Sequence, residues 1–261
     1  MKRTKIQIEK DSFPDAFLPL IDGADVYDSS CSPEARVYFI DRDGGYYLKV
    51  SPKGTLKREA ELDAYFHGKG LGARVLEYLS EDFDYLLTEK VCGEDCCDAL
   101  YLADPARLCD TVAGRLRALH ELDFSDCPVK NRTAEYLETV HENYKKGQYD
   151  LSYLPSHMRA MSIDEAYAFV KKNAHLLKAD TLLHGDYCLP NIMLDGWCFS
   201  GFIDLGNGGV GDRHIDLFWG AWTLGFNLKT DKYRDRFFDA YGRDKVELEK
   251  IDLVSACEVF G

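Results

Sequence analysis

The residues best suited to chemistry lie in two short stretches, HGDYCLPN at 184–191 and GFIDLG at 201–206. Asp186 and Asn191 stand five positions apart in a predicted loop, and Asp204 ends an apolar predicted strand. A carboxylate such as Asp186 can orient an attacking hydroxyl and accept its proton. Amide and carboxylate oxygens, such as those of Asn191 and Asp204, are the ligands that Mg²⁺ prefers. The two stretches therefore predict a general base together with a magnesium site.

The spacing H-x-D-x-x-x-x-N, followed by D-x-G, is typical of the catalytic loop of a kinase. Phosphoryl transfer needs a carboxylate to take the proton of the hydroxyl, and Mg²⁺ to bridge the phosphates. Ordinary solvated loop residues are the alternative interpretation, but their joint spacing between apolar strands favours the kinase loop. We therefore expect Asp186 to be the catalytic residue, and Asn191 and Asp204 to be the metal ligands.

A cation for the phosphates is predicted in the strand YYLKV. Lys49 has aromatic and aliphatic neighbours that would bury the base of its side chain and project its ammonium from one face. Glu59 or Glu61 on the following helix could pair with it, as in the lysine and glutamate pair of kinases. A solvated strand lysine is the simpler interpretation of Lys49 alone. Its place ahead of a helix, two strands and HGD favours the phosphate-binding role.

The elements that would position these residues change character near residue 90. Residues 35–50 are predicted to form a hairpin around Asp43, because the two glycines that follow supply the positive φ of a tight turn. Residues 55–70 have apolar side chains at helical spacing, and two further strands are predicted on either side of 81–82. We therefore predict an N-terminal nucleotide-binding lobe at 1–90, a mostly antiparallel sheet with one helix.

Beyond residue 91 the pattern is mainly helical. Pro105 begins a predicted helix whose apolar residues form one stripe. Further helices are predicted at about 133–146 and 163–177 and from 214 onward, with strands within 181–206. The prediction is an α+β, bilobal fold in which 91–261 is the catalytic and substrate-binding lobe.

Composition narrows the class of protein. The 261 residues are 46% hydrophobic and 30% charged, which is typical of a globular protein, and the formal net charge is −13. Such a charge disfavours binding to nucleic acid or to anionic lipid. The first residues lack the apolar stretch of a signal peptide, and no run approaches the roughly 18 apolar residues of a membrane span. We expect a cytoplasmic protein, a monomer or weak dimer, with neither nucleic acid nor membrane as a partner.

The nine cysteines are an odd number, which disfavours a secreted disulfide framework. Cys92, Cys96 and Cys97 crowd one segment, which makes a zinc site the alternative to consider there. No second pair of ligands follows at a usual spacing, so we interpret them as reduced cysteines.

The stretches HGDYCLPNIM, SGFIDLG and GVGDRHID resemble the aminoglycoside 3'-phosphotransferases. These are bacterial kinases of small molecules, with a protein-kinase-like fold, that inactivate kanamycin-type antibiotics. LHELDFSDCP and the terminal CEVF are similar to the same family, so the resemblance runs from about Ser32 to Phe260. It implies that ATP or GTP, with Mg²⁺, donates the γ-phosphoryl group to a hydroxyl of a small cationic acceptor. The expected acceptor is the 3'-hydroxyl of an aminoglycoside, and the expected consequence is antibiotic resistance.

The resemblance also implies nucleotide contacts. Lys49 would contact the ATP phosphates with Glu59 as its partner. Tyr47 would stack on adenine, and Ser32 would lie in the loop over the phosphates. The hinge residues whose backbone would recognise adenine lie at the end of the last strand of the lobe: Thr88, Glu89 and Val91. In this kind of loop a residue such as His184 more often fixes backbone geometry, and Asp216 at a helix N-terminus would brace the loop in the same way.

The acceptor is expected to be small, because only seven residues separate Asp204 from Asp212 and no peptide-docking activation segment fits there. Its ammonium groups need carboxylates close to the base. Glu258 matches a family position of this kind, and the family's closing Phe corresponds to Phe260. Acids of the helical segment that usually covers the antibiotic are also candidates, although they could equally be solvated helix acids: Asp150, Asp164 and Glu165.

The sequence departs from the family at four positions. Phe226 and Asn227 stand where an acidic pair is usual, Asn207 stands where Arg is frequent, and Gly261 follows the closing Phe. Phe226 and Trp222 could line a less charged pocket, which keeps open a kinase of another alcohol, such as a macrolide, a choline-like molecule or a sugar metabolite. A catalytically silent nucleotide-binding module is the alternative of another class. The presence of the base, the metal ligands and the strand lysine disfavours it.

Overall fold

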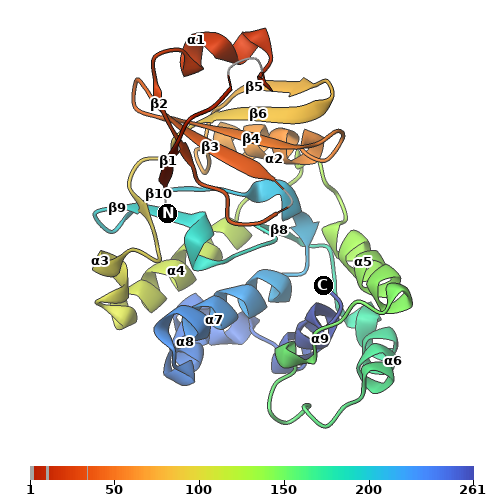
Figure 1. Cartoon of the computed structure of the whole chain (residues 1–261). Coiled ribbons are helices and arrows are strands. Elements are labelled where there is room, and N and C mark those ends of the chain that lie inside the picture. Colours follow the sequence, from red (N-terminus) through yellow and green to blue (C-terminus); the bar gives the residue numbers. More distant parts are fainter. Residues whose placement is uncertain (1–2, 10–11, 34) are drawn as a thin grey trace. The chain divides into compact units, whose positions relative to one another are not determined.

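The computed structural model describes residues 3–9, 12–33 and 35–261, and its backbone contacts divide the chain into two compact units. The first unit comprises residues 1–98 and 190–206, and the second comprises 99–189 and 207–261. Figure 1 shows strands in the first and mostly helices in the second, so the fold is α+β. Within the described residues, none of the helices combines the length and the apolar character that a membrane crossing requires.

The described part of the first unit contains an antiparallel sheet of six strands in the order β1-β2-β3-β4-β6-β5. Neighbours in the sheet are mostly neighbours in sequence, as expected for strands joined by short turns. The strands are β1 (Thr4–Ile6), β2 (Asp25–Asp28), β3 (Arg36–Asp41), β4 (Tyr46–Pro52), β5 (Val75–Ser80) and β6 (Phe83–Glu89).

The predicted hairpin joins β3 to β4. Asp43, Gly44 and Gly45 all have positive φ, at 49°, 98° and 104°. A Cβ on Gly45 would lie 2.7 Å from the ring of Phe39, so this position requires glycine for space as well as for backbone angle. The turn fixes the register that pairs Val37 with Lys49.

Helix α2 (Lys57–Gly68) follows β4 and packs on the sheet. Leu56, Ala60 and Leu86 form the buried contact between helix and sheet. The carboxylate of Asp84 is fully buried and accepts a hydrogen bond of 2.9 Å from the Leu56 N–H. This bond satisfies a backbone donor at the start of the helix and sets where its first turn begins.

A second sheet in the first unit has the order β10-β9-β7, with strands β7 (Glu94–Asp95), β9 (Ile192–Asp195) and β10 (Cys198–Phe202). The 190–206 segment therefore belongs to the first unit, whereas the predicted boundary near residue 90 left it in the C-terminal lobe. A parallel bridge between Gly72 and Phe202 is a second link between the 190–206 segment and the rest of the first unit. Residues 190–206 join the first unit through pairing between strands that are far apart in sequence, such as β7 and β9. Composition along the chain carries no signal of such pairing.

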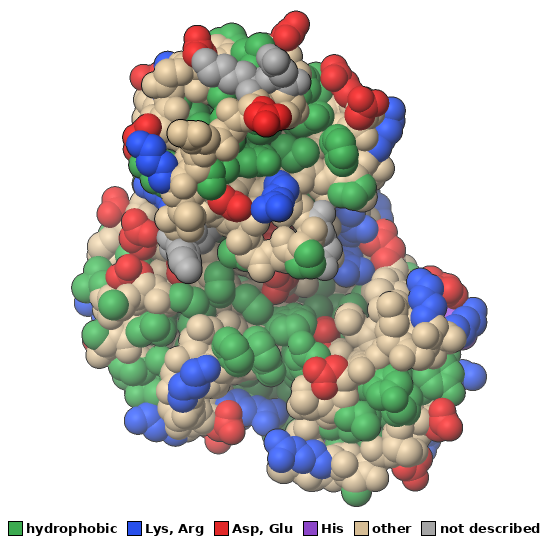
Figure 2. All heavy atoms as spheres, in the orientation of Figure 1, with side chains coloured by type: hydrophobic (Ala, Val, Ile, Leu, Met, Phe, Trp, Pro, Cys, Tyr) green, Lys and Arg blue, Asp and Glu red, His purple; other side chains and the backbone are tan. Residues whose placement is uncertain are grey.

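The second unit is mainly helical, with the two-stranded sheet β8 (Thr181–Leu183) and β11 (Gly209–Gly211). Side chains cap several helices: Asp104 accepts from Arg107 N, Asn131 accepts from Ala134 N, and Ser162 forms a capping box. The helices are α3 (Ala99–Leu102), α4 (Pro105–His120), α5 (Arg132–Lys146), α6 (Ile163–Asn173), α7 (His214–Leu228), α8 (Arg234–Gly242) and α9 (Leu248–Glu258). On the face drawn in Figure 2, hydrophobic side chains gather over α7.

Most predicted elements are confirmed, including the hairpin, α2, the strands on either side of 81–82, α4, and the strands within 181–206. The helix predicted at 163–177 ends earlier, at Asn173, and the last region divides into three helices. The short strands β1 and β2 and the single helical turn α1 (Leu18–Ile21) had not been predicted. Three or four residues give too few alternations to stand out as a period.

Candidate active site

Lys49 lies at the centre of a charged cluster in the first unit. Its Nζ donates hydrogen bonds of 2.8 Å to both carboxylate oxygens of Glu59 and one of 2.9 Å to Oδ1 of Asp204. The exposed fraction of the side chain is 22% for Lys49, 11% for Glu59 and 53% for Asp204. The cluster therefore has a buried side, at Glu59, and an open side, at Asp204.

The charges of this cluster depend on one another. Burial acts to lower the pKa of Lys49, but the charges of Asp204 and Glu59 outweigh it and raise that pKa, so the ammonium is kept. Burial raises the pKa of Glu59, and the charge of Lys49 opposes this rise. A lysine that stays charged at the edge of a buried pair is suited to binding an anion such as phosphate.

Secondary structure brings these three residues together. Lys49 lies on β4 opposite Leu86, and Glu59 lies in the first turn of α2. Of the two glutamates considered from the sequence, Glu59 is the partner of Lys49, whereas Glu61 lies 4.0 Å from Lys57 on the exposed side of the helix.

Asp204 follows β10 with a left-handed φ of 59°, which an aspartate tolerates better than most residues. Antiparallel pairing of β9 with β10 places Asn191 beside the same end of the hairpin, and Ile203 N donates to the backbone carbonyl of Asn191 at 3.1 Å. Non-glycine residues in this region of φ are often found at functional sites. The pairing thus brings both predicted metal ligands to one end of a sheet.

Asp63, which the sequence analysis did not single out, lies one turn after Glu59 on α2 and is 7% exposed. Burial raises its pKa well above the usual range, and the charge of Glu59 adds to the rise. The carboxyl therefore keeps its proton to a higher pH than an exposed aspartate does. A signal was present in the sequence, since an acid four residues after Glu59 shares its helix face.

In the second unit, the loop that carries Asp186 is fixed through its backbone. The N–H groups of His184 and Gly185 each donate a 2.8 Å hydrogen bond to the carboxylate of Asp216. Further along, Leu189 N donates to the hydroxyl of Thr223 on α7 at 3.1 Å. Hydrogen bonds to α7 therefore hold the loop on both sides of Asp186. Asp216 accepts those on the N-terminal side, which is the bracing role expected for it.

Gly185 has a φ of 87°, and a Cβ there would lie 1.8 Å from the carbonyl oxygen of Asn207. Only glycine fits this approach. The same carbonyl of Asn207, at the position where the family often has Arg, accepts a 2.9 Å hydrogen bond from Nε of Arg132.

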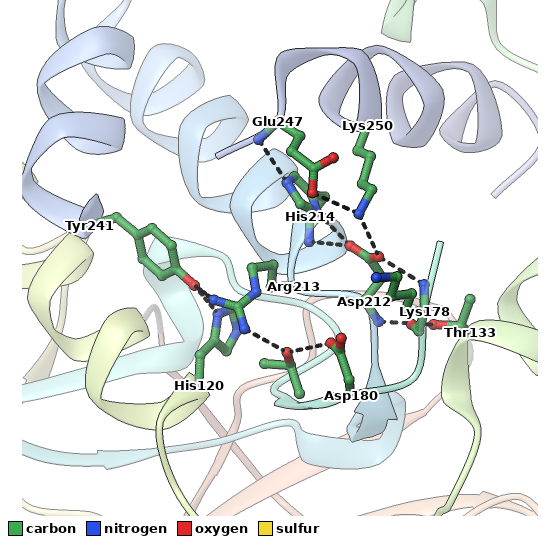
Figure 3. Close-up of polar contacts among 11 residues, drawn as sticks. His120, Thr133, Lys178, Asp180, Asp212, Arg213, His214, Tyr241, Glu247 and Lys250 are labelled. Atoms are coloured by element: carbon green, nitrogen blue, oxygen red, sulfur yellow. Dashed lines mark hydrogen bonds and ion pairs between the residues drawn. The ribbon is translucent and has the colours of Figure 1, made fainter. Parts of the chain in front are cut away.

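A buried network of polar side chains contacts the carboxylate of Asp216 that binds the loop. His120 contacts Asp216 at 3.1 Å through Nε2 and the hydroxyl of Tyr241 at 2.9 Å through Nδ1. Burial lowers the pKa of His120, which favours its neutral form. Figure 3 shows His120 and Tyr241 beside a second group, in which Asp212 bonds His214 at 2.6 Å. The His120 group joins side chains of α4, α7 and α8, so tertiary contacts support the carboxylate that binds the loop.

Glu258, on α9, is 5% exposed and accepts hydrogen bonds from the Tyr136 hydroxyl at 2.8 Å and from Nε1 of Trp219 at 3.1 Å. Burial raises the pKa of Glu258 to about 7, and the charge of Asp186 adds to the rise. Glu258 is therefore a buried carboxyl whose pKa depends in part on the charge of the predicted base, Asp186. Tyr136 and Trp219 were not predicted, because no sequence spacing links them to Glu258.

The other predicted acceptor residues have contacts within the second unit. Asp150 caps a short turn by accepting from Ser152 N at 2.8 Å, and Glu165 completes the capping box with Ser162. Asp164 is exposed and accepts from the hydroxyl of Tyr144 at 2.8 Å. Asp150 and Glu165 thus have structural roles in the capping of their own elements, and contact with an acceptor remains a prediction for all three.

Phe260 is 1% exposed and packs edge-on against the stacked rings of Tyr144 and Tyr167. Its carbonyl accepts from Nδ2 of Asn143 at 2.8 Å. The side chain of Phe260 is thus used in packing. Because it is buried, only the backbone around it could contact an acceptor.

The remaining nucleotide candidates lie in the first unit. Tyr47 pairs across the sheet with Thr88, and its hydroxyl accepts a 2.7 Å hydrogen bond from Arg3. Ser32 is exposed in the turn between β2 and β3. In the predicted hinge the N–H of Glu89 donates a 2.9 Å hydrogen bond to Arg74 O. This N–H is therefore not available to bind adenine. Val91 packs against the position of Gly201.

The model of one protein family, described as the phosphotransferase enzyme family, matches residues 32–252. The chain belongs to this family. A probable aminoglycoside 3'-phosphotransferase of Lactococcus lactis subsp. lactis (strain IL1403) is 52% identical over 262 residues, covering 100% of this chain and 99% of its own length. The predicted resemblance, and with it the class of enzyme, is confirmed.

Solved structures of aminoglycoside phosphotransferases share this fold. A crystal structure of an aminoglycoside 3'-phosphotransferase of type VIII has a TM-score of 0.73 at 25% identity, and covers 96% of each chain. A Streptomyces rimosus aminoglycoside phosphotransferase, in complex with ADP and streptomycin, has a TM-score of 0.72 at 24% identity, covering 98% of this chain and 100% of its own. The protein-kinase-like, α+β fold predicted from the sequence is confirmed.

Proposed function

We propose that this phosphotransferase transfers the γ-phosphoryl group of ATP to the 3'-hydroxyl of an aminoglycoside antibiotic and thereby confers resistance. The observation that carries the proposal is the charged cluster of Lys49, Glu59 and Asp204, since it presents an ammonium where the family motif requires one. The 52% identical relative from Lactococcus lactis supports the acceptor class.

The nucleotide phosphates bind at Lys49 in this proposal. Glu59 fixes the ammonium from the buried side, and the open side at Asp204 is where an anion can approach. Ser32 and the turn around it contribute to the phosphate site. Tyr47, Thr88, Val91 and groups of Glu89 other than its bonded N–H form the adenine site, with GTP as the other candidate donor.

Magnesium fits the residues of the first unit. Asn191 and Asp204 offer only oxygen donors, which suit a hard cation, and the half-exposed carboxylate of Asp204 already pairs with a cationic group. When bound, Mg²⁺ offsets the charge of the phosphates. The carboxylate of Asp204 would be its charged ligand, and it also pairs with the ammonium of Lys49.

Asp186 acts as the base. Its loop is held by backbone hydrogen bonds to Asp216 and Thr223, so the carboxylate is positioned before the acceptor binds. The hydroxyl of the acceptor donates its proton towards Asp186 as its oxygen attacks the γ-phosphorus. The leaving group is ADP.

The acceptor is held by carboxyl groups of the second unit. Glu258 is the best supported, because it is a buried carboxyl at the family position for an ammonium contact, and the charge of Asp186 is one cause of its raised pKa. Asp150, Asp164, Glu165 and the backbone near Phe260 are further contacts for ammonium groups. We place the reaction in the cytoplasm, where ATP is abundant, and propose a monomer or weak dimer.

The experiment compares two acceptors that differ at one hydroxyl. Purified protein with ATP and Mg²⁺ is expected to phosphorylate kanamycin and to leave tobramycin, which lacks a 3'-hydroxyl, unmodified at that ring. Product mass and phosphorus NMR measure the outcome. Phosphorylation of both drugs at another hydroxyl would disprove the position, and reaction with neither drug but with another alcohol would disprove the acceptor class.

A further inference from the structure

An aromatic row crosses the surface of the second unit. It consists of Tyr153, Trp219, Trp222 and Phe226, and the last three share one face of α7 because they recur at helical spacing. The rings of Trp219 and Trp222 lie 5.4 Å apart, and those of Trp222 and Phe226 are stacked at 5.0 Å with an interplanar angle of 9°. Tyr153 contacts both tryptophans, at 5.9 and 6.1 Å.

The outer end of the aromatic row is open to solvent. Phe226 is 56% exposed, although α7 is otherwise one of the most buried helices of the chain. A large aromatic side chain at such a position gains little from folding. The exposed ring is thus available for binding.

The inner end of the aromatic row contacts Glu258, and the residue that follows Trp222 in sequence binds the loop of Asp186. Thr223, the neighbour of Trp222, accepts from Leu189 N of that loop, and its carbonyl accepts from Nδ2 of Asn227 at 2.8 Å. Trp219 donates to Glu258. The row therefore runs from Glu258 to the exposed ring within the second unit.

An ammonium already lies on the exposed ring. Nζ of Lys229 is 4.1 Å from the centroid of Phe226, within the range of a cation–π contact. Lys229 is itself exposed and its side chain is flexible, so another ammonium can take its place. The face thus has the chemistry to bind an amine, with the Glu258 carboxyl at the opposite end of the row.

We propose that Trp222 and Phe226 form a platform that binds an ammonium-bearing ring of the acceptor, and so determine specificity. This rests on the proposed function and deepens it. Aromatic faces attract cations through their quadrupole and pack against the C–H groups of a sugar ring. A platform of this kind selects amino sugars over neutral sugars without a full negative charge.

The test measures affinity for kanamycin and turnover in Phe226→Leu and Trp222→Leu. Calorimetry without nucleotide is expected to show a dissociation constant roughly three- to thirtyfold higher, the range of a cation–π contact. The KM for kanamycin should rise similarly, whereas kcat and the KM for ATP stay within about twofold. Phe226→Tyr keeps an aromatic face and should restore wild-type values. Phe83→Leu, which removes another exposed phenylalanine, is the matched control.

Unchanged kanamycin affinity in both leucine variants would overturn the platform while leaving the proposed function intact. Failure of Phe226→Tyr to restore affinity would also count against it. If the wild-type protein neither binds nor phosphorylates any aminoglycoside, the proposed function and the platform fail together. Circular dichroism and the Tm, which should not change for the exposed Phe226, separate loss of binding from loss of folding.

Discussion

Lys49 has two carboxylate partners, and they differ in burial. The buried partner, Glu59, can only position the ammonium. The half-exposed partner, Asp204, occupies the place from which a phosphate would arrive. Two carboxylates and one ammonium leave a net negative charge, so a triphosphate binds well only together with a cation. This is the physical reason to expect strong Mg²⁺ dependence.

Replacing Lys49 by Met removes the ammonium and keeps the length of the side chain. The loss of one charged donor to a reacting phosphate costs about 10²–10³-fold in turnover, so kcat/KM for ATP should fall by that order. ADP release in steady state measures it. Lys53→Met, at an exposed position after β4, is the control and should match wild type. Near-normal turnover in Lys49→Met would remove Lys49 from the site.

Glu258 predicts a pH dependence of stability. Its pKa is raised to about 7 in the folded protein, above the usual value of 4.5, so the folded state holds the proton more tightly than the unfolded state. Stability from this group is therefore greatest at low pH and is lost as pH rises from about 4.5 to about 7.

Urea unfolding at pH 5.5 and pH 8 measures this effect against Glu258→Gln, whose amide oxygen can still accept from Tyr136 and Trp219. Between the two pH values, wild type should lose on the order of 2 kcal/mol more than the variant. Parallel pH profiles would show that Glu258 does not titrate as its burial implies.

At the scale of elements, the loop of Asp186 depends on backbone contacts that substitution can break. Gly185→Ala adds a Cβ 1.8 Å from the carbonyl of Asn207 at a φ of 87°. Strain of this kind should destabilise the protein by about 3 kcal/mol and lower kcat by displacing Asp186. Urea unfolding and ADP release measure the two effects.

Gly114→Ala is the matched control, because Gly114 is exposed within α4 and a Cβ there meets no atom within 4 Å. This variant should be more stable by up to about 1 kcal/mol, with unchanged kcat. Equal effects of the two substitutions would mean that the Gly185 backbone is not constrained.

The elements that sequence predicts best are those with a complete local signal. The hairpin before Lys49 has both its glycines and its alternation, and α4 has its cap and its stripe. The spacing of Asp186, Asn191 and Asp204 is likewise local. By contrast, the partners of Glu258 come from α5 and α7, and the support of Asp216 comes from α4 and α8. Such contacts depend on tertiary packing, which no short pattern encodes.

At the scale of the whole molecule, the net charge of −13 agrees with a small cationic acceptor but does not specify one. The family places the chain among phosphotransferases, and the fold agrees with that of solved aminoglycoside phosphotransferases. The boundary that sequence placed near residue 90 differs from the division by contacts, because residues 190–206 return to the first unit. This return puts Asn191 and Asp204 in the same unit as Lys49.

The central claim, that Asp186 takes the proton of an aminoglycoside hydroxyl during phosphoryl transfer from ATP, is tested most directly by one comparison. Kanamycin phosphorylation is measured in single turnover for wild type, Asp186→Asn and Asp195→Asn, the last at an exposed carboxylate nine residues further on. The account predicts a loss of roughly 10²–10⁴-fold for Asp186→Asn and none for Asp195→Asn. A rate for Asp186→Asn within a few fold of wild type would contradict it.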